Sequence, residues 1–498
     1  MSVTSQTDER SDHTSGEPKT ITVLGAGVAG LVAAYELERR GHRVRILEGS
    51  NRIGGRVHTY RFGSAKGAQF AELGAMRIPI SHTRALHYIA KLGLLNQVRE
   101  FRTILSDDDD LLRVKDGGYV RVRDAPKALV SALDPGLTEH GYRYNTLLFG
   151  SWLNACLNAV APAQFRDHPN VNADLLDLVD RIDLEPYLCG DSGSKVDLHS
   201  VFADHPYLRS VCSGRHERFL DDVLMETSNA IFRLRHGTDA LTDGLAAKIR
   251  GPLLLGHEVV GLSVRDDGVV VGVRHGGMTS SWHCDYVLCT IPFPVLRRLR
   301  LDGFDDDKLS VIHETQYWPA TKIAFHCREA FWTADGITGG ASFTGGLVRQ
   351  TYYPPVEGDR SLGAVLLASY TIGPDAEKIS KLDPVTRHEV IVTEVSRMHP
   401  RLREPGMILA TVSQVWGEHR WSRGAATIRW TQDAATCEEQ RQAAARPQDR
   451  LFFAGEHCSS KPAWIEGAIE SAIDAVHSIQ WHEPFSGRRS AQRLRRVV

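Results

Sequence analysis

The sequence predicts an α/β fold whose parallel sheet is assembled from distant parts of the chain and accompanied by a mixed-sheet domain and a helical insertion. Residues 20–48 read as a strand, a glycine turn, a helix and a second strand. Residues 286–291 form a short apolar run, as expected of a strand buried on both faces. Residues 450–479 repeat the strand-then-helix pattern near the C-terminus, so we expect the sheet to be discontinuous in sequence.

The first glycine turn lies in residues 25–30, whose sequence GAGVAG has the spacing of a dinucleotide-binding loop. Gly25 permits the tight turn, Gly27 lets the backbone approach a pyrophosphate, and Gly30 lets the helix pack against the sheet. Because the first N–H groups of a helix lack partners inside it, the phosphates would lie against the helix N-terminus at Ala29. The strand before the turn and the helix after it make the motif specific.

The segment after the second strand distinguishes between dinucleotides. Glu48 ends that strand, where its carboxylate can accept hydrogen bonds from both ribose hydroxyls of an adenosine without a 2′-phosphate. Residues 50–57 then supply a second glycine pair, including Gly55, and two arginines, Arg52 and Arg56. A dissociable nicotinamide needs less phosphate-binding machinery, so the sequence predicts a tightly held FAD. The alternative is a plain glycine turn beside a solvated arginine.

Composition limits the possible functions. A chain of 498 residues is too long for one ordinary core, so two or three domains are expected. Lys and Arg number 59 against 61 Asp and Glu, and this balance argues against nucleic-acid binding. No apolar run is long enough for a transmembrane helix, so no membrane association is expected. The eight cysteines are scattered without metal-ligand spacing, which predicts reduced thiols in the cytoplasm and no metal site.

The segments after the dinucleotide motif change from strands to helices. A helix is predicted from Ser81, as its cap, to about Leu95. Residues 101–122 alternate weakly and turn twice, as short antiparallel strands do. Residues 126–225 are rich in Leu, Ala, Asp and Arg, with helical stretches near 145–160 and 172–183. This part of the chain is therefore interpreted as a helical insertion.

From residue 231 the pattern returns to strands. Residues 231–249 predict a strand, a glycine turn and a helix, and residues 257–275 predict a hairpin. Residues 316–432 are rich in strands and aromatic side chains. We expect a FAD-binding domain in 19–60, 236–310 and 447–482, a substrate-binding domain in 61–124 and 311–446, a helical domain in 125–235, a disordered tail in 1–18 and a basic tail in 483–498.

The C-terminal return supplies further cofactor contacts. A short apolar strand ends at Gly455, Glu456 follows, and a helix begins near Trp464 and Ile465. A strand and helix at this place would complete the N-terminal sheet, so all four residues are expected to contact the cofactor. Glu456 would reach the ribityl or phosphate groups, and the alternative is a carboxylate that only caps the helix.

The GGR after the N-terminal motif, together with the C-terminal FAGEH and WIEGAIES, resembles the flavin amine oxidase family. Residues 72–79, ELGAMRIP, are similar to the segment that characterises bacterial L-amino acid oxidases. This resemblance implies that Arg77 holds the substrate carboxylate while Gly74 and Met76 lie along the flavin. A guanidinium offers a planar fork that matches a carboxylate, whereas an ammonium offers a point charge. The alternative is a structural salt bridge with Glu72.

The same resemblance implies roles for other residues. Tyr370, in LLASYTIGPDA, matches the tyrosine that donates to the substrate carboxylate, and Lys322, in YWPATKIAF, matches the lysine that holds a water beside flavin N5. Trp464 would form an aromatic wall beside the reacting carbon, after Ala463, where some family members have glycine. Val259 would meet the adenine. The alternatives are a core tyrosine and a solvated lysine at a strand edge.

The resemblance to L-amino acid oxidases also implies the chemistry. An L-amino acid, with a bulky aromatic or basic side chain favoured, and O₂ would give a 2-oxo acid, ammonia and hydrogen peroxide. Residues 421–425, WSRGA, lack the cysteine that binds flavin covalently in monoamine oxidases, so FAD is expected to be non-covalent. Alternatives are a monoamine or polyamine oxidase and a decarboxylating amino-acid 2-monooxygenase. His457 and His236 are candidate general bases by composition alone, and a homodimer or larger homo-oligomer is expected.

Overall fold

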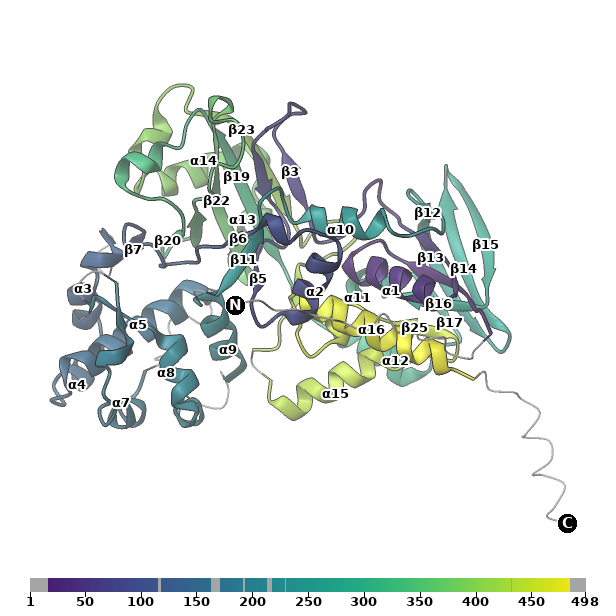
Figure 1. The fold of residues 1–498 in the computed structure, drawn as a ribbon, viewed down its shortest axis with the longest axis horizontal. Helices are drawn as coiled ribbons and strands as arrows, with labels where there is room; N and C mark the ends of the chain where they lie inside the picture. The colour runs from purple at the N-terminus through teal and green to yellow at the C-terminus, as the bar shows by residue number, and fades with distance from the viewer. Residues whose placement is uncertain are drawn as a thin grey trace, which may run out of the picture.

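The structure, a computed structural model, describes residues 17–483 except 115–117, 163–170, 191–192, 213–216, 229 and 431, and only the backbone of 217 and 218. The expected tails therefore lie almost entirely outside the described residues. Figure 1 shows three parts: a parallel sheet with its helices on the right, a larger mixed sheet at the top, and a group of helices at the lower left. No helix among the described residues is long and apolar enough to cross a membrane.

A five-stranded parallel sheet forms the core of the dinucleotide-binding part. Its central strand pairs on one side with the strand that follows in sequence and on the other with a strand from the second half of the chain, which in turn pairs with the C-terminal strand. Both the buried strand near residue 286 and the C-terminal strand are thus confirmed as members of this sheet. The order is β12 (Leu253–Leu254), β2 (Arg43–Leu47), β1 (Thr20–Leu24), β16 (Tyr286–Cys289) and β25 (Leu451–Phe453).

Alternating side chains of these strands bury both faces of the sheet. Leu288 packs into the cluster formed with helices α1 (Val28–Arg39) and α16 (Ile465–Trp481). Its neighbour Val287 packs into the cluster on the other face. That face is covered by a second sheet and two helices: β13 (Glu258–Arg265), β14 (Gly268–His275), β15 (Met278–Cys284), β17 (Arg300–Asp302), α12 (Asp306–Glu314) and α15 (Ala434–Ala445). The antiparallel pairing of β13 with β14 confirms the expected hairpin.

A seven-stranded mixed sheet forms the second part, and all its neighbours are antiparallel except β20 and β7. It joins strands on either side of the helical insertion. The order is β23 (Ile408–Val415), β19 (Ala320–Cys327), β22 (Ala364–Ile372), β21 (Gln350–Tyr352), β20 (Ala341–Phe343), β7 (Leu111–Arg113) and β8 (Tyr119–Arg121). Helices α13 (Gly373–Ser380) and α14 (Pro384–Val395) lie against it.

Strand β11 (Ile231–Leu234) does not belong to either large sheet. It pairs with β5 (Ile78–Pro79) and β6 (Val98–Glu100), and α10 (Asp239–Ala246) follows it, as the sequence predicts for residues 231–249. The sequence assigns β11 to the helical domain, yet both its partners lie in the segment before that insertion. The domain limits stay predictions.

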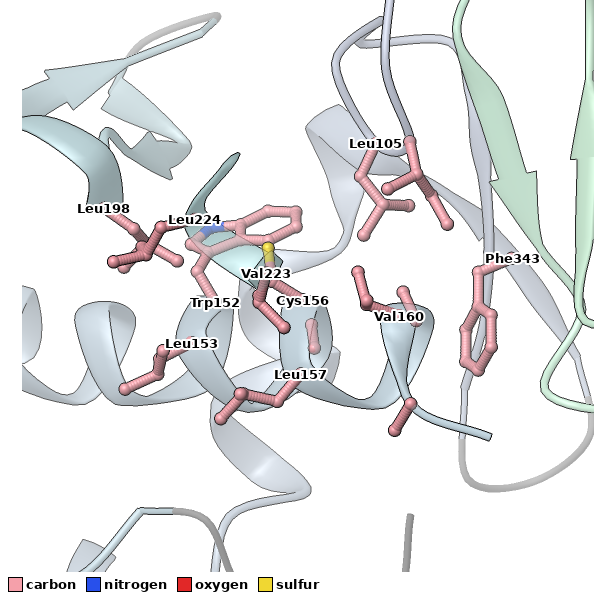
Figure 2. Close-up of a cluster of buried hydrophobic side chains, with 14 of the residues drawn as sticks. Leu105, Trp152, Leu153, Cys156, Leu157, Val160, Leu198, Val223, Leu224 and Phe343 are labelled. Carbon is pink, nitrogen blue, oxygen red and sulfur yellow. The ribbon is translucent and has the colours of Figure 1, made fainter. Parts of the chain in front are cut away.

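The insertion is built around one almost completely buried helix, α5 (Tyr144–Val160). Trp152 and Cys156 of α5 lie beside Val223 and Leu224, while Val160, near the end of α5, lies toward Phe343 (Figure 2). This shared apolar cluster fixes the insertion against the mixed sheet. The other helices are α3 (Pro126–Ser131), α4 (Pro135–Thr138), α7 (Ala173–Val179), α8 (Leu198–Asp204) and α9 (Glu217–Glu226), with a short ribbon of β9 (Leu188–Cys189) and β10 (Lys195–Val196).

One predicted helix differs in its limits. Helix α2 (Thr83–Lys91) begins after His82, so Ser81 is not its cap, and it ends before the left-handed Gly93. Its free N–H groups are satisfied from a distance, because the Glu466 carboxylate of α16 accepts from Arg84 N at 3.2 Å and from Ala85 N at 2.9 Å. Because Glu466 is distant in sequence, the residues around Ser81 carry no pattern that would predict this cap.

Replacing Gly30 with alanine is expected to destabilise the parallel-sheet part. A Cβ at Gly30 would lie 2.0 Å from the carbonyl oxygen of Gly25, which is itself held at φ +108°. Such overpacking costs about 1–3 kcal/mol, so the thermal midpoint followed by circular dichroism should fall. The matched control is Gly118→Ala, whose new Cβ would come no closer than 4.0 Å to Val114. Equal midpoints for the two variants would contradict the close packing at Gly30.

Candidate active site

One large cavity lies where the carboxyl ends of the parallel strands meet the mixed sheet and helix α9. Apart from the two histidines considered as general bases, all but one of the residues predicted for the site line this cavity. Gly30 is the exception, because it packs against the Gly25 carbonyl inside the turn. The residues brought together are Gly25, Gly27, Ala29, Glu48, Gly55, Arg56, Gly74, Met76, Arg77, Val259, Lys322, Tyr370, Gly455, Glu456, Trp464 and Ile465.

Two glycine turns meet at one end of the cavity. Gly54 N donates to Ala26 O at 2.8 Å, and a Cβ at Gly55 would lie only 3.2 Å from the Cα of Gly27. Helix α1 begins here without a side-chain cap or an acidic residue in its first turn. Its N–H groups and positive dipole end therefore face the cavity free of a competing carboxylate. This cradle fits the pyrophosphate of a dinucleotide.

Glu48 is held rigidly at the end of β2. Its Oε2 accepts from Ala26 N and its Oε1 from Ser50 N, both at 2.8 Å. A carboxylate has about four acceptor sites, so two remain for ribose hydroxyls. Arg52 was expected to contact the pyrophosphate. In the structure its terminal nitrogens instead donate to the carbonyls of Ile53, Gly55 and Val57, and these bonds stabilise the loop.

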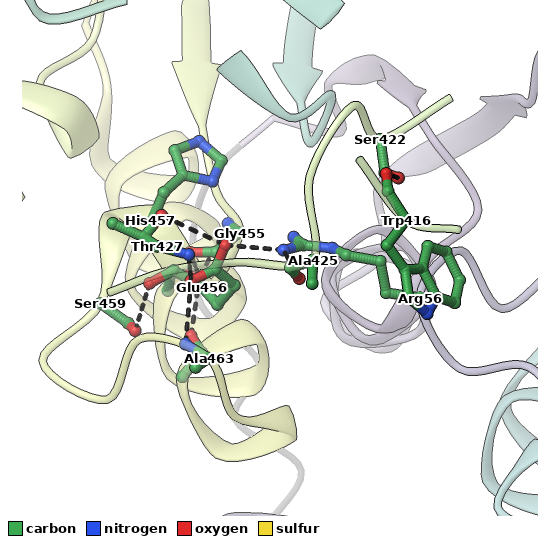
Figure 3. Close-up of polar contacts among 12 residues, drawn as sticks. Arg56, Trp416, Ser422, Ala425, Thr427, Gly455, Glu456, His457, Ser459 and Ala463 are labelled. Atoms are coloured by element: carbon green, nitrogen blue, oxygen red, sulfur yellow. Dashed lines mark hydrogen bonds and ion pairs between the residues drawn. The ribbon is translucent and has the colours of Figure 1, made fainter. Parts of the chain in front are cut away.

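Arg56 and Glu456 form an ion pair that joins the N-terminal loop to the C-terminal return (Figure 3). Arg56 Nη1 lies 2.7 Å from Glu456 Oε1 and also donates to Ala425 O at 2.9 Å, and Glu456 Oε2 accepts from Ala463 N at 2.9 Å. Burial opposes ionisation of Glu456, but the charge and hydrogen bond of Arg56, together with the other contacts such as the Ala463 N–H, outweigh it and lower the pKa of the carboxyl. Glu456 thus holds together the loops around the cavity, and its contact with ribityl or phosphate groups stays a prediction.

The Ala463 backbone in this network is left-handed, with φ +70°. A residue with a Cβ is strained there, whereas glycine is not. This conformation gives a physical reason why glycine would suit the position.

Arg77 lies just before β5, and 7% of its side chain is exposed. Its Nη2 pairs with Glu226 Oε1 at 3.1 Å, whereas its buried Nη1 has no hydrogen-bond partner. Burial alone would lower the pKa of Arg77, but Glu226 and the neighbouring tyrosines raise it, so the guanidinium stays charged. The alternative partner, Glu72, instead accepts from Thr238 N at 2.6 Å and from Thr59 Oγ1 at 2.9 Å. Arg77, which lines the cavity, therefore keeps one buried donor without a partner.

Lys322 and Tyr370 are paired residues on strands β19 and β22. Lys322 Nζ donates to Gly74 O at 2.7 Å, to Glu72 O at 3.2 Å and to Met76 Sδ at 3.2 Å, and it lies 4.8 Å from the centre of the Tyr370 ring. Burial, reinforced by the charge of Arg77, lowers the pKa of Lys322 to about 7. With 4% of its surface exposed, Lys322 is not a solvated edge residue. A water held by Lys322 would have to replace one of these three acceptors.

Several charged residues of the cavity were not predicted, and two of them are carboxylates on the last turns of α9. Asp222 accepts from Trp430 Nε1 at 2.6 Å, and burial raises the pKa of Asp222 to about 6. Glu226 is the partner of Arg77. Arg349, only 1% exposed, donates to Val160 O and lies over the Tyr370 ring. Acids four residues apart on a helix usually mark a solvated face, so the sequence alone offers no reason to place these in a cavity.

The two histidines proposed as general bases do not line the cavity. His457 is buried with its ring 4.3 Å from the Phe293 ring, and burial lowers the pKa of His457 to about 3. His236 is exposed in the turn after β11. No cysteine lines the described cavity, and the described part of the chain contains no cluster of metal-ligating side chains. Non-covalent attachment of the flavin stays a prediction.

Glu456→Gln should loosen the cavity end at which the two loops meet. The substitution leaves Arg56 without its charged partner, and breaking a largely buried pair costs about 3 kcal/mol or more. We expect a lower thermal midpoint and an FAD dissociation constant raised more than tenfold, measured by flavin fluorescence on dilution. Asp302→Asn, at an exposed pair with Arg300, is the control and should change neither quantity. Unchanged FAD affinity in Glu456→Gln would show that the pair does not support the cofactor.

Comparison with known proteins identifies a matching family and similar chains. Residues 28–480 match the family described as flavin containing amine oxidoreductase. RebO, a flavin-dependent L-tryptophan oxidase from Lentzea aerocolonigenes, is 55% identical over 464 residues, covering 93% of this chain and 98% of that protein. An L-amino-acid oxidase from Demansia vestigiata is 28% identical over 475 residues, covering 93% and 87%.

Among solved structures, putrescine oxidase bound to putrescine has a TM-score of 0.62 at 18% identity, covering 93% of this chain and 99% of that chain. A double mutant of putrescine oxidase gives a TM-score of 0.63 at 17% identity, with coverage of 93% and 99%. At these identities the likeness shows the fold alone. The predicted α/β fold and flavin cofactor are confirmed, and the chain belongs to the flavin-containing amine oxidoreductase family.

Proposed function

We propose that this chain is an FAD-dependent L-amino acid oxidase whose substrate is L-tryptophan or a closely related aromatic amino acid. The observation that carries the proposal is Arg77, which lines the cavity and whose buried Nη1 has no hydrogen-bond partner. An unsatisfied buried cationic donor is costly, so the site favours a ligand that brings a carboxylate. A plain amine would leave that donor unpaired.

The walls around Arg77 favour an aromatic side chain over a basic one. Trp318 and Trp430 meet edge to face with their ring centres 5.3 Å apart, and Ile372 and Ile428 line the same cavity. Apolar and aromatic walls favour burial of a flat ring such as indole. The name of the relative with 55% identity points the same way.

The chain's residues would place the substrate rather than carry electrons. Arg77 and Tyr370 would hold the carboxylate and thereby orient Cα, which is the main catalytic contribution of such a site. Trp464, with its ring 5.7 Å from the Arg77 guanidinium, would exclude water on the opposite side. Bound FAD would supply the redox chemistry, taking a hydride from the substrate and passing two electrons to O₂. A cytoplasmic location and a homo-oligomeric state remain predictions.

The proposal is tested by mixing the holoenzyme anaerobically with L-tryptophan. We expect the yellow flavin absorption to bleach, and admission of air to restore it with one hydrogen peroxide and one 2-oxo acid per turnover. Tryptamine, which is L-tryptophan without the carboxylate, should bleach the flavin at least a hundredfold more slowly. Faster bleaching by tryptamine would indicate an amine oxidase, and an amide product with loss of CO₂ would indicate a monooxygenase.

Arg77→Ala should weaken the turnover of L-tryptophan while flavin stays bound. Removing one partner of a buried charge interaction costs about 2–5 kcal/mol, and about 1.4 kcal/mol corresponds to a factor of ten. The expected fall in kcat/KM is therefore about thirtyfold to a few thousandfold, measured by peroxide formation. Arg77→Lys is the matched variant, and it should recover only part of the loss because it keeps the charge without the planar fork. Normal kcat/KM in Arg77→Ala would refute the assigned carboxylate site.

A further inference from the structure

The Arg77–Glu226 pair is incomplete on both sides. Each partner uses one terminal atom in the 3.1 Å contact between Arg77 Nη2 and Glu226 Oε1. The other terminal atoms, Arg77 Nη1 and Glu226 Oε2, are buried without a hydrogen-bond partner, and both residues line the cavity. The pair therefore presents one unsatisfied donor beside one unsatisfied acceptor. An α-amino acid carries the complementary groups, a carboxylate and an ammonium, on a single carbon.

Helix α9 fixes the position of the Glu226 carboxylate. Val223 and Leu224, on the turn before it, are buried in the cluster that α5 shares with the mixed sheet (Figure 2). On the same helix Asp222 accepts from Trp430 Nε1 at 2.6 Å. Only 14% of the Glu226 side chain is exposed. The acceptor is thus held in place by the insertion rather than by the dinucleotide-binding part.

We infer that Glu226 binds the α-ammonium group of the substrate and accepts one of its protons. This inference rests on the proposed function. One N–H bond of the ammonium breaks and an O–H bond forms at Glu226 Oε2, while the electron pair stays on the nitrogen. The neutral amine can then donate that pair toward Cα as the hydride leaves for the flavin, which gives the iminium (the protonated imine). Glu226 returns the proton to solvent after the product has left.

The cations near the cavity act on the charge of the substrate amine. Two arginines and a lysine already lie close, so an additional ammonium is disfavoured in its charged form. In a dry site a neutral amine beside a neutral carboxyl also avoids the cost of burying two charges. The charged and titratable groups that act on Glu226 are Arg77, Arg349, Lys322, Tyr352, Tyr370 and Asp222.

Other titratable groups of the site have contacts of their own. His419, which lines the cavity, has its Nδ1 3.3 Å from Ser422 Oγ. Lys322 directs its three donors at two carbonyls and the Met76 sulfur. Asp222 is bound to Trp430, and neither His457 nor His236 lines the cavity. Among the described residues that line the cavity, Glu226 alone has a buried carboxylate oxygen without a partner.

The first test follows anaerobic flavin reduction by saturating L-tryptophan from about pH 6 to about pH 10. Glu226→Gln can still accept a hydrogen bond but cannot take a proton, so its rate constant at pH 7 should fall about a hundredfold. The deficit should shrink at high pH, where the substrate arrives as the free amine. Glu226→Asp should recover part of the loss. Asp221→Asn, on the exposed side of the same helix and paired with Arg209, is the matched control and should leave the profile unchanged.

The second test compares the binding of two ligands to wild type and Glu226→Gln. Indole-3-propionate has the ring and carboxylate of L-tryptophan but no amino group, and its binding is read from the flavin spectrum without turnover. Glu226→Gln should raise the dissociation constant of L-tryptophan about tenfold, the worth of one charge-assisted hydrogen bond. It should leave indole-3-propionate bound as tightly or more tightly, because a like charge beside the carboxylate is gone.

The outcomes separate this inference from the proposed function. Absence of bleaching in the wild type by L-tryptophan and by other amino acids would refute the proposed function itself. A wild type that reacts, with Glu226→Gln sharing its pH profile, would overturn only the role of Glu226. Equal weakening of both ligands would overturn it as well, since Glu226 would then act on the ring or on the fold.

Discussion

The parallel pairing of β1 with β16, and of β16 with β25, is the constraint on which the site depends. Parallel strands carry their carboxyl ends to one edge, so the turns after three distant segments meet there. The Arg56–Glu456 pair then locks the N-terminal glycine loop to the C-terminal return. Neither segment could shape the cavity alone, because each supplies only part of the wall. The long connection between them is free to carry the parts that meet the substrate.

Buried charge is tolerated at this junction because nearly every charged group is paired. Glu456 is compensated by Arg56, Lys322 by two carbonyls, and Arg349 by the Val160 carbonyl. A buried ionised group without such partners would cost several kcal/mol. Arg77 and Glu226 differ in that an unpaired donor and an unpaired acceptor belong to one ion pair, and these free atoms are a cost that the folded protein retains. A ligand with the complementary charges relieves it on binding.

The cofactor end of the cavity could be predicted from the sequence because its signals are local. The turn at Gly25 and the acid at the end of β2 lie in one contiguous motif, and their geometry follows from backbone sterics. The resemblance to a known family added Arg77, Lys322 and Tyr370, which the fold indeed brings to one cavity. Neither a local motif nor the family resemblance pointed to Glu226 and Arg349. Their positions depend on how the insertion packs on the mixed sheet, and an isolated acid on a helix carries no sign of what it will face.

This difference separates the parts of the cavity that the backbone fixes from the parts that can vary. The dinucleotide cradle and the sheet edge depend on backbone geometry, and the overall fold is shared with putrescine oxidase at 18% identity and a TM-score of 0.62. The acceptor beside Arg77 comes instead from α9, which is held through α5 by apolar contacts. Such apolar contacts fix the position of helix α9. They do not depend on which polar residues lie on the side of the helix that faces the cavity. A change on one face of α9 can therefore alter which end groups the cavity accepts without disturbing the cofactor site.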